Sequence, residues 1–139
     1  MEDRYDLQRF LHAQEPVFEQ VVAELRAGYK TGHWMWFIFP QLRGLGSSAL
    51  ATRFGISSLA EAAAYLQHPV LGKRLRQCTQ LVLDANRRSI TQIFSYPDDL
   101  KFRSCMTLFR QAGSDSGVFR AALERYFAGE ADPQTLVCL

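Results

Sequence analysis

The residues best suited to acid–base chemistry are His33 and the acidic pair Asp98-Asp99. A carboxylate held beside an imidazole can act as a general base, while the imidazole acts as an acid or as a positioning group. Lys101 and Ser104 follow the acidic pair and are suited to binding a substrate oxyanion. The sequence therefore predicts His33, Asp98 and Asp99 as a catalytic set for hydrolysis or group transfer, provided that the two segments meet in the fold.

The acidic pair also has a structural interpretation. Pro97-Asp98-Asp99 is typical of the first turn of a helix, where carboxylates oppose the positive end of the helix dipole. Asp98 and Lys101 are spaced i, i+3, so they lie side by side on such a helix. The sequence leaves both interpretations open.

A glycine-rich stretch lies between the two candidate segments. Gly44-Leu45-Gly46-Ser47-Ser48-Ala49 matches the pattern G-x-G-x-x-A, in which glycines let the backbone approach a phosphate. We exclude a dinucleotide-binding fold, because that fold needs a parallel βαβ unit and the surrounding sequence is helical. Ser47 or Ser48 can still cap a short helix whose free N–H groups attract an anion. Lys30, His33 and Arg43 are neighbours that could contact the same anion. The alternative is an ordinary turn into a capped helix.

The stretch Trp34-Met35-Trp36-Phe37-Ile38-Phe39 has six large apolar residues in a row and no polar face. We expect a buried helical turn or an extended segment through the middle of the fold. One interpretation is that the rings form the core, and the other is that one indole lines a cleft and stacks on a planar ligand. The two are compatible if only some of the rings face inward. The candidate ligand-binding residues are Lys30, Trp34, Trp36, Gln41, Arg43, Gly44, Gly46, Ser47, Lys101 and Ser104.

Metal and cofactor chemistry has no support in the sequence. The three histidines are scattered without metal-ligand spacing, and no nucleophile motif is present. Cys78, Cys105 and Cys138 form no C-x-x-C pair, and the first two fall on apolar helix faces, where a thiol is usually inert. We therefore expect reduced thiols, no metal and no cofactor.

Apolar spacings of three and four residues predict helices along most of the chain. The clearest stripe runs over residues 71–85, in alternating steps of four and three. Ser58 with Glu61 and Ser89 with Gln92 are candidate capping boxes, because a serine is followed three residues later by a glutamate or glutamine.

Helix ends are marked as clearly as helix starts. Gly28 stands where a left-handed C-terminal residue is expected, and His68-Pro69 stops a helix. Gly113 ends another helix, after which Ser114 or Ser116 caps the last long one. No sustained two-residue alternation indicates strands. The sequence therefore predicts an all-α fold, an irregular orthogonal bundle of six or seven short helices with a buried aromatic connecting segment.

Composition limits the class of protein and of partner. The 139 residues fit one domain, which we expect to span residues 1–139, and 47% hydrophobic residues supply a core. A formal charge of +2 argues against a nucleic-acid partner. The charged N-terminus lacks the apolar run of a signal peptide, and no stretch is long enough to span a membrane. We expect a cytoplasmic protein without a membrane partner.

Several motifs together resemble one family. They are Arg9-Phe10 with Ala13-Gln14, residues 33–42 with Gly44-Leu45-Gly46, Tyr65-Leu66 through His68-Pro69-Val70-Leu71-Gly72, and Ile93-Phe94 through Asp98-Asp99-Leu100-Lys101 to Thr107-Leu108-Phe109. In these motifs the chain is similar, over nearly its whole length, to the bacterial domain of unknown function 1810 family. The resemblance implies a mainly helical fold and no established activity.

Two details qualify what the resemblance implies. The family pattern has glycine after Ile93-Phe94, where this chain has Ser95. Some members of the family are labelled calpastatin, but that label does not transfer, because this class of protease inhibitor is a disordered repeat protein and the present chain has a core.

Two functions of different classes remain open. The first is binding of a phosphate-bearing, nucleotide-like ligand in a cleft near His33 and Asp98. The second is a protein-interaction module or homodimer with no catalytic activity, in which exposed aromatic residues close on another chain. A third, RNA binding, is weakened by the small net charge, although aromatic residues beside Lys30 and Arg43 keep it open.

Overall fold

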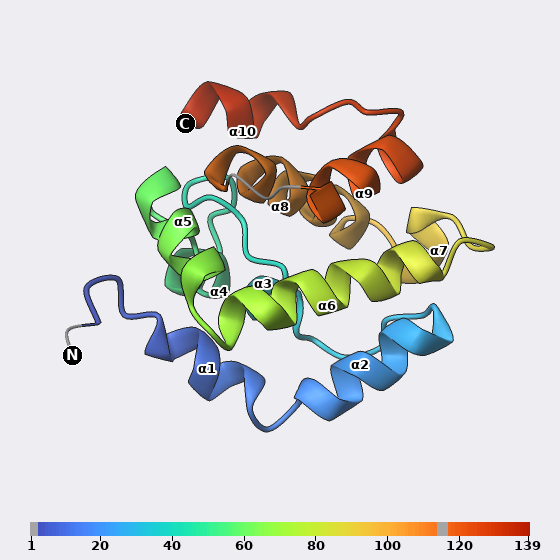
Figure 1. Cartoon of the computed structure of the whole chain (residues 1–139), viewed down its shortest axis with the longest axis horizontal. Coiled ribbons are helices and arrows are strands. Elements are labelled where there is room, and N and C mark those ends of the chain that lie inside the picture. The colour runs from blue at the N-terminus through green and yellow to red at the C-terminus, as the bar shows by residue number, and fades with distance from the viewer. Residues whose placement is uncertain (1–2, 114–116) are drawn as a thin grey trace.

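The computed structural model describes residues 3–113 and 117–139, which form an irregular bundle of helices (Figure 1). This confirms the predicted all-α fold with its buried aromatic connecting segment. The ten helices of the described residues are α1 (Gln8–Gln14), α2 (Phe18–Ala27), α3 (Met35–Ile38), α4 (Ala49–Arg53), α5 (Leu59–Gln67), α6 (Leu71–Asp84), α7 (Ile90–Phe94), α8 (Asp98–Ala112), α9 (Gly117–Phe127) and α10 (Pro133–Cys138).

The helices are short. Six of them have seven or more residues, and the other four, α3, α4, α7 and α10, have only four to six. Within residues 3–113 and 117–139, no helix combines the length and the apolar character needed to cross a bilayer.

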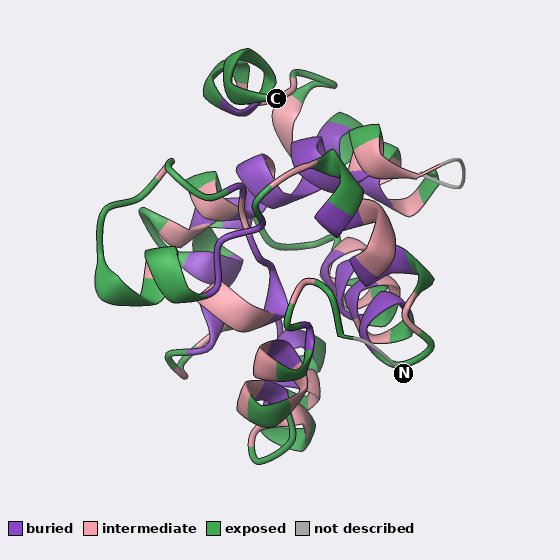
Figure 2. Cartoon of the chain, turned by 90° about the vertical axis from the view of Figure 1, so that its left-hand side faces the viewer, coloured by how far each residue is buried: buried purple, intermediate pink, exposed green. Residues whose placement is uncertain are grey.

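Two helices, α6 and α8, organise the bundle. Helix α8 packs against α5, α7, α9 and α10, and α6 packs against α2, α5 and α9. In Figure 1, α6 crosses the front of the molecule, with α1 and α2 below it and α8 to α10 above it. Figure 2 shows that the buried residues lie on the inward faces of the helices and along the segment that connects them.

Aromatic rings fill the centre where the connecting segment passes between the helices. The Phe39 ring lies 5.1 Å from Phe102 and 5.7 Å from Phe94, edge to face in both cases, and 6.2 Å from Trp34. Such pairs stabilise a fold by about 0.5–1.5 kcal/mol each beyond the area that they bury. The segment therefore holds the bundle together from within.

The predicted helix caps are formed with one difference. Ser89 and Gln92 form the complete capping box at the start of α7. At the start of α5, the Ser58 hydroxyl accepts the Glu61 N–H at 3.1 Å, but the Glu61 carboxylate accepts hydrogen bonds from Ser57 instead of Ser58. That second capping box is therefore half formed, because its carboxylate also pairs with an arginine.

Helix ends follow the glycine positions predicted from the sequence. Gly28 ends α2 with φ +75°, the left-handed conformation that glycine adopts without strain. Gly113 ends α8. The predicted cap at Ser114 or Ser116 lies outside the described residues.

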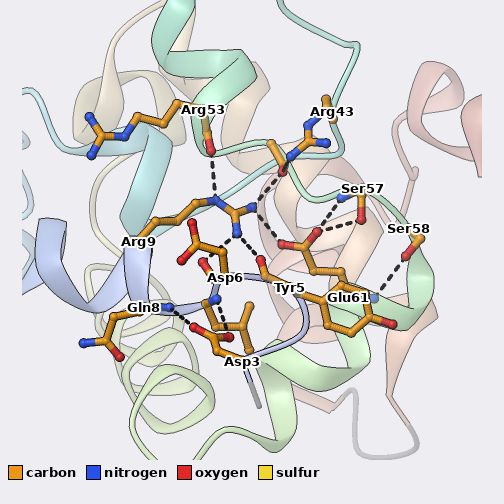
Figure 3. Close-up of polar contacts among 12 residues, drawn as sticks. Asp3, Tyr5, Asp6, Gln8, Arg9, Arg43, Arg53, Ser57, Ser58 and Glu61 are labelled. Carbon is orange, nitrogen blue, oxygen red and sulfur yellow. Dashed lines mark hydrogen bonds and ion pairs between the residues drawn. The ribbon is translucent and has the colours of Figure 1, made fainter.

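The arginine that pairs with Glu61 is Arg9, which joins three parts of the chain (Figure 3). Its guanidinium donates to the carbonyl oxygens of residues 5–6, to those of Arg53 at 2.9 Å and Gly55 at 3.0 Å, and to the Glu61 carboxylate at 2.8 Å. The side chains of Arg9 and Glu61 are only 9% and 2% exposed. Arg9 therefore fixes the loop after α4 against α1 and α5.

Replacing Arg9 by lysine tests this role. Arg9→Lys keeps the charge but loses the planar fork, so several carbonyl acceptors lose their donors, and we expect the free energy of unfolding to fall by about 3 kcal/mol. Urea unfolding measures the change. The exposed Arg4 is the control, because Arg4→Lys should alter stability by less than about 0.5 kcal/mol. Equal stability of the two variants would contradict the role.

Ser95, between α7 and α8, has an unfavourable backbone conformation. Its φ of +64° and ψ of 161° lie in a region that essentially only glycine adopts. The Ser95 N–H donates to Thr91 O at 2.8 Å and its carbonyl accepts from Asp99 N at 3.0 Å, so both neighbouring helices hold it in place. The glycine of the family pattern would fit here without strain.

Ser95→Gly should therefore stabilise the protein. Relief of about 1–3 kcal/mol of strain outweighs the larger entropy that glycine gives the unfolded chain, leaving a gain of about 1 kcal/mol. The midpoint of denaturant unfolding measures it. Ser95→Ala keeps a Cβ and should give no gain, so an equal rise for both variants would show that strain is not the cause.

Candidate functional site

A pocket of about 440 Å³ opens between the segment after α3, the first turns of α8 and the start of α10. Its lining residues are Trp36, Gln41, Leu45, Gly46, Ser47, Ser48, Ala51, Pro97, Leu100, Lys101, Ser104, Asp132 and Gln134. Those that belong to the predicted ligand-binding set are Trp36, Gln41, Gly46, Ser47, Lys101 and Ser104. The two segments singled out in the sequence thus face each other across one pocket.

The two tryptophans lie on opposite sides of the chain. Successive residues of a helical turn rotate by about 100°, so residues two apart point in nearly opposite directions. Trp34 is 2% exposed and belongs to the core, whereas Trp36 is half-buried and lines the pocket. Trp34 is therefore one of the core rings, and Trp36 is the indole that lines a pocket.

Beside the pocket, one carboxylate pairs with two lysines, and each lysine lies close to one indole ring. The Asp98 carboxylate lies 2.9 Å from Lys30 Nζ and 3.4 Å from Lys101 Nζ. Lys30 Nζ lies 5.2 Å from the centre of a Trp34 ring, and Lys101 Nζ lies 4.8 Å from the centre of a Trp36 ring. Asp98 thus positions Lys101 over Trp36, and only this second pair is part of the pocket lining.

The predicted catalytic residues are not gathered at this pocket. His33 is exposed, and neither His33 nor the acidic pair is among its lining residues. Asp99 accepts hydrogen bonds from Thr91 Oγ1 at 3.0 Å and from Leu100 N at 2.9 Å, so it ties the start of α8 to α7. Asp98 likewise has a structural role, because its carboxylate pairs with Lys30 and Lys101.

The glycine-serine stretch forms one wall of the pocket. Gly46, Ser47 and Ser48 line it, and the Ser48 hydroxyl caps α4 by accepting Ala51 N–H at 3.1 Å. Because α4 has only five residues, its dipole adds little attraction for an anion. Gly44, with φ +99°, makes the turn outside the lining.

Arg43 lies elsewhere than the sequence suggests. Its guanidinium donates to the Gly55 carbonyl at 3.2 Å, beside the Arg9 network (Figure 3). Arg43 is not among the residues that line the pocket. Its backbone N–H donates to Ile56 O at 2.8 Å, so the chain here runs alongside residue 56. The Arg43 side chain therefore supports the loop around α4.

The wall formed by α10 is the part of the site that sequence reasoning missed. Asp132 caps α10, and its carboxylate accepts hydrogen bonds from Thr135 N and Ser104 Oγ, both at 3.1 Å. Its N–H donates to Thr107 Oγ1 at 2.8 Å. The Asp-Pro step signals the start of a helix, but nothing local signals which helix it docks on. The bonds from α8 bring Asp132 and Gln134 to the pocket.

Glu24 anchors the chain that leads into the aromatic segment. Its Oε1 accepts hydrogen bonds from Thr31 N at 2.6 Å, Gly32 N at 2.9 Å and Trp34 Nε1 at 3.0 Å, and its Oε2 accepts one from Gln20. Burial alone would raise the pKa of Glu24, but these four donors outweigh it and lower the pKa to about 2.

Stability should therefore depend on pH through Glu24. Its pKa rises from about 2 in the folded chain to 4.5 in the unfolded chain, so its stabilisation is complete above pH 4.5 and is lost as the pH falls towards 2. Allowing for solvent screening, we expect the free energy of unfolding of wild type to exceed that of Glu24→Gln by about 2 kcal/mol at neutral pH. This difference should shrink in acid.

Urea unfolding at a series of pH values measures this difference. The matched control is Glu19→Gln, at an exposed position of the same helix. A stability difference for Glu24→Gln that stays constant across the pH range would refute the electrostatic explanation.

Two of the three thiols are buried and poorly suited to nucleophilic chemistry. Burial raises the pKa of Cys78 to about 12 and that of Cys105 well above its ordinary value. In the part of the chain that the structure describes, no group of three or more His, Cys, Asp or Glu residues is placed to hold a metal ion.

Comparison with known proteins agrees with this fold. The model of a protein family of unknown function, DUF1810, matches residues 4–139. The chain belongs to this family. The crystal structure of the conserved hypothetical protein Rv1873 from Mycobacterium tuberculosis is similar, with 58% identity and a TM-score of 0.95 over 99% of this chain and 98% of that one. No curated protein matches.

Proposed function

We propose that the protein binds a small, planar, phosphate-bearing ligand, of the nucleotide type, in the pocket between Trp36 and Lys101. The observation that carries the proposal is the ammonium group of Lys101, 4.8 Å from the centre of a Trp36 ring within the pocket lining. A flat ring stacks on an indole, and the neighbouring ammonium group meets an anionic substituent of the same ligand.

The size and polarity of the pocket support this ligand class. Ligand pockets commonly measure about 300–1,000 Å³, and this one measures about 440 Å³. Apolar surface from Leu45 and Leu100 lies beside polar groups of Gln41, Ser47 and Gln134. Amide and hydroxyl groups can pair with the edge of a heterocycle, while the apolar residues cover its faces.

The arrangement of charge favours binding over catalysis. Lys101 and Asp132 are the charged residues of the lining, and Asp132 already caps α10 and accepts from Ser104. Asp98, which holds Lys101 in place, is engaged by two lysines. Lys101 therefore remains as the group that faces an anion.

Ligand binding is tested by thermal shift and tryptophan fluorescence, with AMP, ADP and inorganic phosphate as probes. We expect the nucleotides to raise Tm, because a ligand that binds only the folded state stabilises it by mass action. Trp36→Leu and Lys101→Met should each weaken binding by about tenfold or more.

Lys73→Met is the matched control, because Lys73 is exposed on α6, away from the pocket lining. Trp36→Phe should also remove most of the fluorescence response, because Trp34 is buried. A folded wild-type protein whose Tm none of these probes alters would count against the proposal, as would equal weakening by the Lys73 variant.

The alternative function, self-association or docking of a protein, rests on apolar side chains at the rim. Tyr96 is 75% exposed and Leu100 is 47% exposed, and the intervening Pro97 lines the pocket. Sedimentation analysis of wild type and Leu100→Glu separates the two functions. A dimer that the substitution dissociates would favour association, whereas a monomer that binds nucleotide favours the ligand.

A further inference from the structure

Four exposed arginines gather where α2, α6 and α9 end, on a face different from the pocket. Arg26 is in the last turn of α2, Arg87 and Arg88 follow α6, and Arg125 is in the last turn of α9. The first three line a hollow of about 230 Å³, and the Arg125 guanidinium donates to the carbonyl of Asn86 in the same loop. Figure 1 shows the α6–α7 loop projecting at one end of the molecule, above the end of α2. We call these four residues the arginine face.

The arginine face concentrates positive charge that the composition conceals. Asp84 is the acidic residue of the hollow, so the four arginines and Asp84 carry a formal charge of +3, against +2 for the whole chain. In the regions 3–113 and 117–139, none of the four guanidinium groups takes part in an ion pair. The small net charge therefore does not exclude a polyanionic partner.

Arg9, which lines a different hollow, differs from these arginines in its contacts. Arg9 donates to four backbone carbonyls and to Glu61, which uses up its guanidinium (Figure 3). At the arginine face, by contrast, Arg26 and Arg87 have no hydrogen bond from their side chains among the described residues. Their planar guanidinium groups remain open to phosphate, which they can bind through two parallel hydrogen bonds.

An exposed aromatic residue follows the α2 part of the arginine face in the chain. Tyr29 is 53% exposed and directly follows Gly28, which lines the hollow. Exposed rings next to arginines provide stacking surfaces for unpaired bases. Compensation of helix dipoles explains Arg26, but it explains neither the exposed ring nor Arg87, which lies beyond the last turn of α6.

We propose that the arginine face binds single-stranded RNA, with guanidinium groups on successive phosphates and Tyr29 stacked on a base. Guanidinium groups carried by three helix ends match a chain of phosphates better than a single anion. The ring adds a stacking surface for an unpaired base. This surface is separate from the nucleotide pocket, so either proposal can fail without the other.

The test is fluorescence anisotropy with a short, labelled single-stranded RNA of mixed sequence over a range of salt concentrations. Arg26→Ala/Arg87→Ala is the test variant, because Arg88 and Arg125 donate to backbone carbonyls and help to hold the loop. It should weaken binding roughly tenfold at low salt. The slope of the logarithm of the association constant against log [salt] is negative, and the variant should make it less steep by about 1.4.

The control variant Arg53→Ala/Lys73→Ala removes the same charge from exposed positions elsewhere and should bind as wild type does. Tyr29→Ala should weaken binding by at least about fivefold, whereas Tyr29→Phe should preserve it. Circular dichroism and thermal melting establish that every variant is folded.

Three results would overturn the proposal. The first is a folded wild-type protein that shows no salt-dependent binding of the RNA. The second is an equal loss in the test and control variants. The third is displacement of the RNA by polyglutamate as effectively as by unlabelled RNA, which would indicate an acidic protein partner instead.

Discussion

The bond between the Trp34 indole N–H and the Glu24 carboxylate is the contact on which the site depends. A buried indole needs an acceptor for its N–H, and a buried carboxylate needs several donors. Glu24 meets both needs while also holding two backbone N–H groups of the preceding turn. With Trp34 fixed towards the core, the geometry of the helical turn sends Trp36 the other way. The hydrogen bond between Trp34 and Glu24, on the core side of the chain, thus determines that Trp36 faces the pocket.

The helices and their caps could be predicted from the sequence, because they depend on interactions between residues close together in the chain. The features that could not be predicted depend on contacts between distant segments. Spacings of three and four residues gave the helices, and short motifs such as Ser89 with Gln92 gave their starts. The sequence predicts a cleft between the segment from His33 to Ser48 and the helix that begins near Asp98. The pocket is lined by residues of both segments, but neither His33 nor Asp98 is among them. Arg43 and Asp132 show the limit, because their partners, Gly55 and α8, are set by tertiary contacts that no local pattern records.

Arginines illustrate how burial decides the role of one residue type. Arg9 is almost enclosed, and its donors are matched to carbonyls and a carboxylate, so it acts as a structural tie. Arg87 stands on an exposed turn among residues of the same charge. Composition counts both equally, which is why a total charge near zero describes the surface of this protein poorly.

The distribution of thiols has a practical consequence for anyone working with the molecule. Cys78 and Cys105 are buried, while Cys138 is exposed on α10, whose first turn reaches the pocket. A maleimide dye added to the native protein would therefore attach at a single natural position, with no need for engineered cysteines. Attached there, the dye would report on motions of the C-terminal helix next to the pocket. Unfolding would expose Cys78 and Cys105, so it could be detected as the attachment of additional dye.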